Sequence, residues 1–196
     1  MGIRLAALVL AFAALPLAAA EVDPIPTPDK WRKESFDFPL QFAPTIPYSG
    51  TEHVRFSPTW SRFATEEGFT YVFMWDLKRK PVAPEDVEEY LETYFTGLMK
   101  NVGLQRKIPD KEVKTVVAAH PLASLEGWAQ GYGVEVRTWN AFSKGEKVLL
   151  HGEVGQRDCG ERMQIFFAFS QAKRDRPIWE GLRAVRKATS CDKSGS

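Results

Sequence analysis

His151 and Glu153 are two side chains of the kind that carry out acid–base or metal chemistry, and they stand two residues apart. In an extended strand, residues at this spacing point to the same face, so the imidazole and the carboxylate would lie side by side. Such a pair supplies half of a metal site or of an acid–base pair, although on a hairpin strand it also commonly just faces solvent. The other histidines, His53 and His120, have no ligand at helix-face spacing. We therefore take His151 and Glu153 as candidate binding residues and predict no metal site.

Trp139 is the third candidate binding residue, because of its position in a predicted strand over Val134–Phe142. It falls on the same side of the strand as Glu135 and Arg137, opposite the alternating apolar positions. An exposed tryptophan at this place would offer its ring to a sugar or to an apolar partner. The alternative is that a second layer, such as residues 36–42 or the long helix predicted below, covers this face.

The two cysteines of the chain, Cys159 and Cys191, have no third thiol to compete for either of them. In an oxidising compartment such a pair is most simply a structural disulfide. A redox pair would normally use a local Cys-x-x-Cys motif, which the sequence lacks. Free or metal-bound thiols are the remaining alternative.

The sequence lacks the nucleophile elbow of hydrolases and the glycine pattern of dinucleotide-binding loops. It contains no Gly-x-Ser-x-Gly elbow, and Gly131-Tyr132-Gly133 does not continue into a dinucleotide-binding pattern. We therefore predict no catalytic residue and no cofactor.

The first twenty residues have the pattern of a secretory signal peptide. One positive charge at Arg4 precedes an apolar run over Leu5–Leu17, and Ala18–Ala20 then present small side chains suited to signal peptidase. We expect cleavage before Glu21 and a periplasmic or secreted protein, with no membrane-spanning segment after cleavage.

The remainder is predicted to be a short lead followed by one domain. Alternating prolines over residues 21–31 indicate an extended lead, which would be mobile unless it docks on the domain. Residues 32–196 fit a single domain of ordinary size. The whole chain has 26 Lys and Arg against 25 Asp and Glu, and this balance argues against a nucleic-acid partner.

Hydrophobic periodicity predicts an α+β fold with a mainly antiparallel sheet. Alternation over 36–42 predicts a half-buried edge strand, while 70–77 is apolar on both faces and should be a central strand. Apolar residues at helical spacing predict a long helix over about 84–102, closed by Gly103, and a final helix over about 176–189 capped by Asp175. We expect both helices to pack on one face of the sheet. Further strands are predicted within 53–56, 113–119, 127–130, 134–142, 147–154 and 163–169, with turns at 143–146 and 156–161.

Two stretches of the sequence resemble known groups of proteins. The first, made of Glu34–Leu40, Phe42–Pro44, Ile46–Tyr48, Val54–Pro58 and Tyr71–Phe73, resembles a family of uncharacterised proteobacterial exported proteins and implies no activity. The second, Ile165–Ser170 with Ile178–Leu182, is similar to the closing strand and helix of Mog1/PsbP-like domains. That similarity implies a non-enzymatic binding or assembly role.

Three functions remain open at this point. The first is an exported, non-enzymatic envelope protein that binds a protein partner or an apolar ligand. The second is a periplasmic hydrolase or metal-dependent enzyme whose residues are brought together by folding. The third is a structural or assembly factor.

Overall fold

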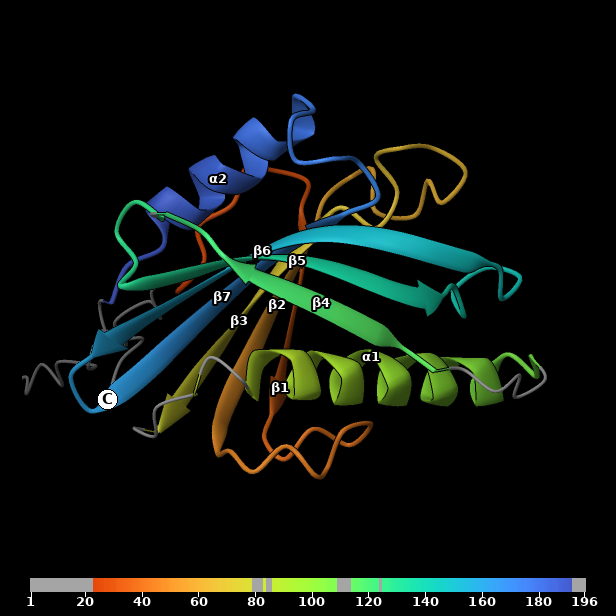
Figure 1. Ribbon diagram of the computed structural model, residues 1–196, viewed down its shortest axis with the longest axis horizontal. Helices are drawn as coiled ribbons and strands as arrows, with labels where there is room; N and C mark the ends of the chain where they lie inside the picture. Colours follow the sequence, from red (N-terminus) through yellow and green to blue (C-terminus); the bar gives the residue numbers. More distant parts are fainter. Residues whose placement is uncertain (1–22, 79–82, 84–85, 109–113, 124, 192–196) are drawn as a thin grey trace, which may run out of the picture.

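A computed structural model describes residues 23–78, 83, 86–108, 114–123 and 125–191 (Figure 1). The predicted signal peptide and its cleavage site lie outside these residues. Within them, seven strands form one antiparallel sheet with the order β1-β2-β3-β7-β6-β5-β4, which confirms the predicted α+β class. The elements are β1 (Arg32–Asp37), β2 (Gly50–Phe56), β3 (Tyr71–Lys78), α1 (Asp86–Gln105), β4 (Val116–Pro121), β5 (Gln130–Trp139), β6 (Lys147–Cys159), β7 (Arg162–Ser170) and α2 (Ile178–Ala188).

The two helices cover opposite faces of the sheet, so the prediction that both pack on one face is wrong (Figure 1). The reason lies in β3, which has the central position that its sequence predicted. Its Phe73 and Trp75 belong to the apolar core under α1, whereas Val72 and Met74 belong to the core under α2. Because successive strand residues point to opposite faces, a strand that is apolar throughout needs a cover on each side.

Helix α1 begins with three acidic residues, Asp86, Glu88 and Glu89, which complement the positive end of its dipole. It runs past Gly103, which was predicted to close it. The chain leaves the helix instead at Lys107, whose φ is 57°, and the Ile108 N–H donates to the Gly103 carbonyl at 2.9 Å. A Cβ at Gly103 would lie 3.0 Å from the Trp139 ring, so the glycine lets this ring pack closely against the helix. Among the described residues, no helix combines the length and apolarity needed to cross a membrane.

Two glutamates of α1 close the edge of the sheet at β4. Glu92 accepts a hydrogen bond from the Val117 backbone N–H at 3.1 Å, and Glu88 accepts one from the Ala119 N–H at 2.6 Å. An edge strand otherwise presents such groups to solvent or to another chain. The contacts fix α1 along β4 (Figure 1).

At the other edge, β1 lies earlier in the chain than the predicted strand 36–42. It spans Arg32–Asp37 and ends ahead of Pro39, which has no N–H to donate to a ladder. Residues beyond it, including Leu40, fold back as a loop into the core under α1. Phe36 is consequently 42% exposed instead of half-buried in a longer strand.

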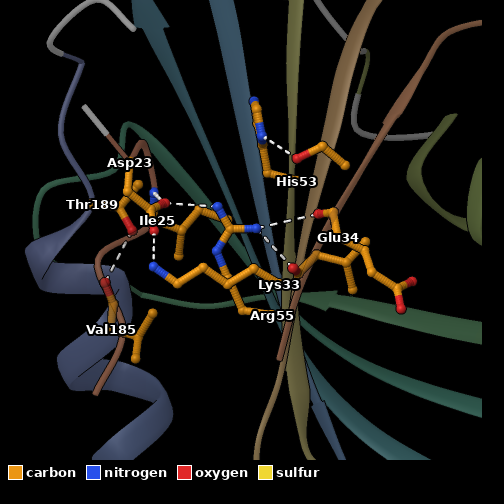
Figure 2. Close-up of polar contacts among 10 residues, drawn as sticks. Asp23, Ile25, Lys33, Glu34, His53, Arg55, Val185 and Thr189 are labelled. Carbon is orange, nitrogen blue, oxygen red and sulfur yellow. Dashed lines mark hydrogen bonds and ion pairs between the residues drawn. The ribbon is translucent and has the colours of Figure 1, made fainter. Parts of the chain in front are cut away.

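The Pro-rich lead docks on the face of the sheet that carries α2. Figure 2 shows Asp23 facing Arg55 and Lys33, and the Arg55 guanidinium lies 2.7 Å from the Asp23 carboxylate. Ile25 is fully buried in the apolar core under α2. Burial raises the pKa of Asp23, but hydrogen bonds from Lys33 and Arg55 outweigh it and hold this pKa below its usual range.

The C-terminal part of the domain is closed by a disulfide between Cys159 and Cys191, as predicted. Strand β6 continues as far as Cys159, so the predicted turn over 156–161 shortens to Gly160 and Glu161. Gly160 has a φ of 77°, a conformation that a β-carbon disfavours. Helix α2 begins after Pro177 without a side-chain cap, so the predicted cap at Asp175 is wrong.

Candidate functional site

Trp139 is buried and is not an exposed binding surface. Its side chain is 4% exposed and belongs to the apolar core under α1, beside Gly103 and Ile108. The alternative weighed from the sequence, that another layer covers it, is therefore the one observed. Helix α1 is that layer.

His151 and Glu153 lie on one strand of the sheet, but each side chain has its own partner. The His151 ring lies 3.7 Å from the Glu135 carboxylate, and burial lowers the pKa of this histidine despite that neighbour. Glu153 is buried and pairs with two arginines of α2, Arg183 and Arg186. Trp139 lies in the core under α1, so the three candidates do not converge on one site.

The geometry of the ion pairs of Glu153 indicates a structural role for this residue. Arg183 donates from two nitrogens at 3.0 and 2.6 Å to one carboxylate oxygen, and Arg186 donates to the other. Burial raises the pKa of Glu153, but these hydrogen bonds outweigh it and lower the pKa. The carboxylate is thus held ionised and fully engaged, and it fastens α2 to the sheet.

Metal ligands do not gather in the part of the chain that the structure describes. No group of three or more His, Cys, Asp or Glu side chains that could hold a metal ion occurs there. His53 lies 3.0 Å from the Ser35 hydroxyl, and His120 lies 3.0 Å from the Arg174 guanidinium.

A cavity of about 530 Å³ lies between the β1–β2 end of the sheet and the C-terminal half of α1. Its floor is formed by strand side chains such as Glu52 and Val54, and α1 contributes Leu98 and Val102. We call it the aromatic pocket, because its walls include Phe42, Phe56, Trp60, Tyr71, Tyr94 and Phe142. Its volume is that of a small-molecule site.

The aromatic walls are braced by contacts among the rings. Trp60 lies 4.9 Å from Phe56 and 5.1 Å from Phe142 between ring centroids, both edge to face. Phe42 meets Tyr94 at 5.0 Å in the same manner. Edge-to-face pairs of this kind hold rings in defined positions, so the pocket is formed in the unliganded chain.

Glu52 is a buried carboxyl on the floor of the aromatic pocket. It is 0% exposed and lies between Phe36 on β1 and Trp75 on β3 in the register of the sheet. The Trp75 indole N–H donates to Glu52 Oε1 at 3.3 Å, whereas Oε2 has no hydrogen-bond partner among the described residues. Burial raises the pKa of Glu52 to about 7, against the opposing effect of the Tyr94 and Trp75 donors. A buried carboxyl that lines a cavity and has a strongly raised pKa is a candidate functional group.

The raised pKa of Glu52 also makes the free energy of unfolding depend on pH. Its pKa is about 7 in the folded state against an ordinary value of 4.5, so the unfolded chain releases this proton first as pH rises. The favourable contribution of Glu52 to the free energy of unfolding is fully present below pH 4.5 and is lost as pH rises through about 7. For Glu52→Gln we expect the free energy of unfolding, relative to wild type, to rise by about 3 kcal/mol between pH 4.5 and pH 8. Urea unfolding followed by tryptophan fluorescence measures this.

The control for that comparison is Glu34→Gln, which removes a carboxylate from the rim of the same pocket. Glu34 is only half-buried and pairs with Arg32 at 3.5 Å. Its loss should leave the pH dependence nearly as in wild type. Equal pH dependence in Glu52→Gln and wild type would contradict the assignment.

The rim of the aromatic pocket is polar and carries two arginines, Arg32 and Arg106. The Arg32 guanidinium lies 4.3 Å from the centre of the Phe56 ring, and Arg106 donates to the Phe142 carbonyl. Both arginines are exposed, so their charges are solvated. The pocket therefore combines a polar mouth, aromatic walls and one acidic group at the floor.

A second hollow, of about 620 Å³, lies where residues 42–45 cross α1. It is lined by solvated groups such as Lys100 and Lys114 and by threonines, and none of its lining side chains has a buried, unpartnered polar atom. The aromatic pocket is for this reason the candidate functional site.

The chain matches no protein-family model and no curated protein sequence.

Sequence reasoning missed Glu52, although a signal for it exists. The predicted second strand began at His53, and this start left Glu52 outside the alternation. With the strand extended to Gly50, Glu52 shares a face with Val54 and Phe56, both of which contribute to the core under α1. An acid on the apolar face of a strand is the pattern that marks a buried carboxyl.

Proposed function

We propose that this protein is exported and that it binds a small apolar molecule in the aromatic pocket. The observation that carries the proposal is the cavity of about 530 Å³ with aromatic walls and a single acidic group at its floor. Ligand sites of soluble proteins are typically concave, largely apolar and supplied with a few placed polar groups. The braced rings reduce the cost of ordering the site on binding.

The export part of the proposal is supported by the signal-peptide pattern of the first twenty residues and by the disulfide Cys159–Cys191. Disulfides persist in oxidising compartments such as the periplasm. The similarity of the closing strand and helix to Mog1/PsbP-like domains agrees with a binding role instead of an enzymatic one.

Filling the aromatic pocket should abolish ligand binding. The probe is the neutral fluorophore N-phenyl-1-naphthylamine, whose emission rises in apolar surroundings. Leu98 lines the pocket from α1, so Leu98→Trp should reduce probe affinity at least tenfold by occupying the cavity. Fluorescence titration of the mature protein measures this.

The matched control is Leu104→Trp, the same substitution on the same helix. Leu104 is 72% exposed and does not line the aromatic pocket, so probe affinity should stay within twofold of wild type. Thermal unfolding verifies that both variants fold. A wild-type protein that fails to enhance probe emission, or equal affinity in wild type and Leu98→Trp, would refute the proposed function.

A further inference from the structure

The carboxyl at the floor of the aromatic pocket has one oxygen, Glu52 Oε2, that makes no hydrogen bond among the described residues. The Trp75 indole N–H donates to Glu52 Oε1, and the Tyr94 phenol is a second donor to this carboxyl, while Oε2 itself makes no hydrogen bond within the described part of the chain. The residue is 0% exposed, so bulk water does not solvate this oxygen. A buried carboxylate oxygen without a donor costs free energy, and a ligand that brings a donor relieves this cost.

The charges around Glu52 favour a cation at this depth. The nearest titratable groups from β3 and α1 are the phenols of Tyr71 and Tyr94, whose pKa values are raised well above the usual range by burial, so both stay neutral. The positive side chains of the pocket, Arg32 and Arg106, are exposed at the rim. No basic side chain lines the floor among the described residues. The Glu52 charge therefore has no counter-ion of its own.

The walls add to this preference. A cation positioned over an aromatic face is attracted to the ring, and the attraction increases when both are shielded from water. Tyr71 and Tyr94 line the pocket beside Glu52 and are both buried. An anionic ligand group would instead meet a carboxylate and electron-rich rings.

We propose, resting on the proposed function, that the ligand of the aromatic pocket is an amphipathic amine. Its apolar body lies among the aromatic walls, and its ammonium group donates to Glu52 Oε2. The ion pair forms away from solvent, so it supplies specificity for an amine over an alcohol or an acid of the same size. At pH 8 the carboxyl, with a pKa of about 7, is mainly ionised, and an alkylamine is still protonated.

Displacement of bound N-phenyl-1-naphthylamine at pH 8 tests the proposal with three ligands of equal chain length: n-octylamine, n-octanol and octanoate. In wild type, octylamine should displace the probe at a concentration at least tenfold lower than octanol, and octanoate should be the weakest. In Glu52→Gln the tenfold preference for the amine should disappear, while octanol should remain within threefold of wild type. Glu34→Gln, which removes a rim carboxylate, should keep the preference.

The outcomes separate the two proposals. If all three ligands displace the probe equally in wild type, or if Glu52→Gln keeps the amine preference, the pocket binds apolar molecules but the assignment of Glu52 is wrong. If the preference is lost in Glu34→Gln instead, the amine binds at the rim and the proposal is overturned. If the probe does not bind wild type, the proposed function itself fails. Thermal unfolding of each variant confirms that it is folded.

Discussion

Glu153→Ala is expected to lower the free energy of unfolding at pH 7 by about 3–5 kcal/mol, because it leaves a buried guanidinium without its carboxylate. The guanidinium is that of Arg186, whose side chain is 6% exposed and whose charge is neutralised by Glu153. Arg183 also loses its partner, but it is 38% exposed and can turn to solvent. Urea unfolding monitored by circular dichroism measures the change.

Two variants test whether the pairing itself is responsible. Glu126→Ala breaks another ion pair to α2, the 2.6 Å contact with Lys187, but both side chains are exposed, so its loss should change stability little. The double variant Glu153→Met/Arg186→Met replaces both buried charges by apolar groups and should recover most of the lost stability. A double variant as unstable as Glu153→Ala would show that packing, and not charge pairing, explains the effect.

Acid titration gives a second measurement of the same contact. Although burial raises the pKa of Glu153, hydrogen bonds from Arg183 and Arg186 lower it below its ordinary value of 4.5. Such a group stabilises the fold above its unfolded pKa, and the contribution is lost as pH falls through the folded pKa. Glu153→Gln should therefore show a smaller loss of stability below pH 4.5 than wild type.

Removing the disulfide in Cys159→Ser/Cys191→Ser is expected to lower the free energy of unfolding by roughly 3–4 kcal/mol in the chain-entropy model. The bridge spans 32 residues and ties the segment after α2 to the end of β6. The largest local effect should fall on α2, whose amide protons should exchange faster with solvent. Denaturant unfolding and hydrogen exchange measure the two effects.

The aromatic pocket provides the internal control for the disulfide variant. It lies on the α1 side of the sheet, away from the bridge, so probe affinity below the unfolding transition should be unchanged. Thiol titration should find no reactive cysteine in native wild type and two after reduction. Unfolding free energies that are equal with and without the bridge would contradict the expected contribution.

The strands were more predictable from the sequence than the way the layers stack. The apolar run at β3 correctly indicated a central strand, because it leaves no polar face for solvent. The same apolar run requires a cover on each face of the sheet, and this requirement excludes an arrangement with both helices on one side. The identity of each cover depends on which strand edges α1 and α2 reach, and local periodicity does not contain that information.

The candidate site was harder to predict than the fold. His151 and Glu153 share a strand, as their spacing indicated, yet their partners Glu135 and Arg186 come from other elements. The pocket likewise joins side chains from distant segments, such as Phe142 and Trp60, through tertiary packing alone. Only Glu52 carried a local signal, and a strand boundary misplaced by a few residues concealed it.

The two edge strands of the sheet are protected from pairing with other chains in different ways. At β4, the protection comes from the glutamates that hold α1 against the strand. Another strand that paired with β4 would first have to displace Glu88 and Glu92 from the backbone N–H groups of Ala119 and Val117. These hydrogen bonds therefore oppose edge-to-edge aggregation through β4. At the opposite edge, β1 begins with the charged run Arg32-Lys33-Glu34, which discourages such pairing by another means. Thus α1 opposes the addition of another strand at one edge of the sheet, and the charged side chains of β1 oppose it at the other.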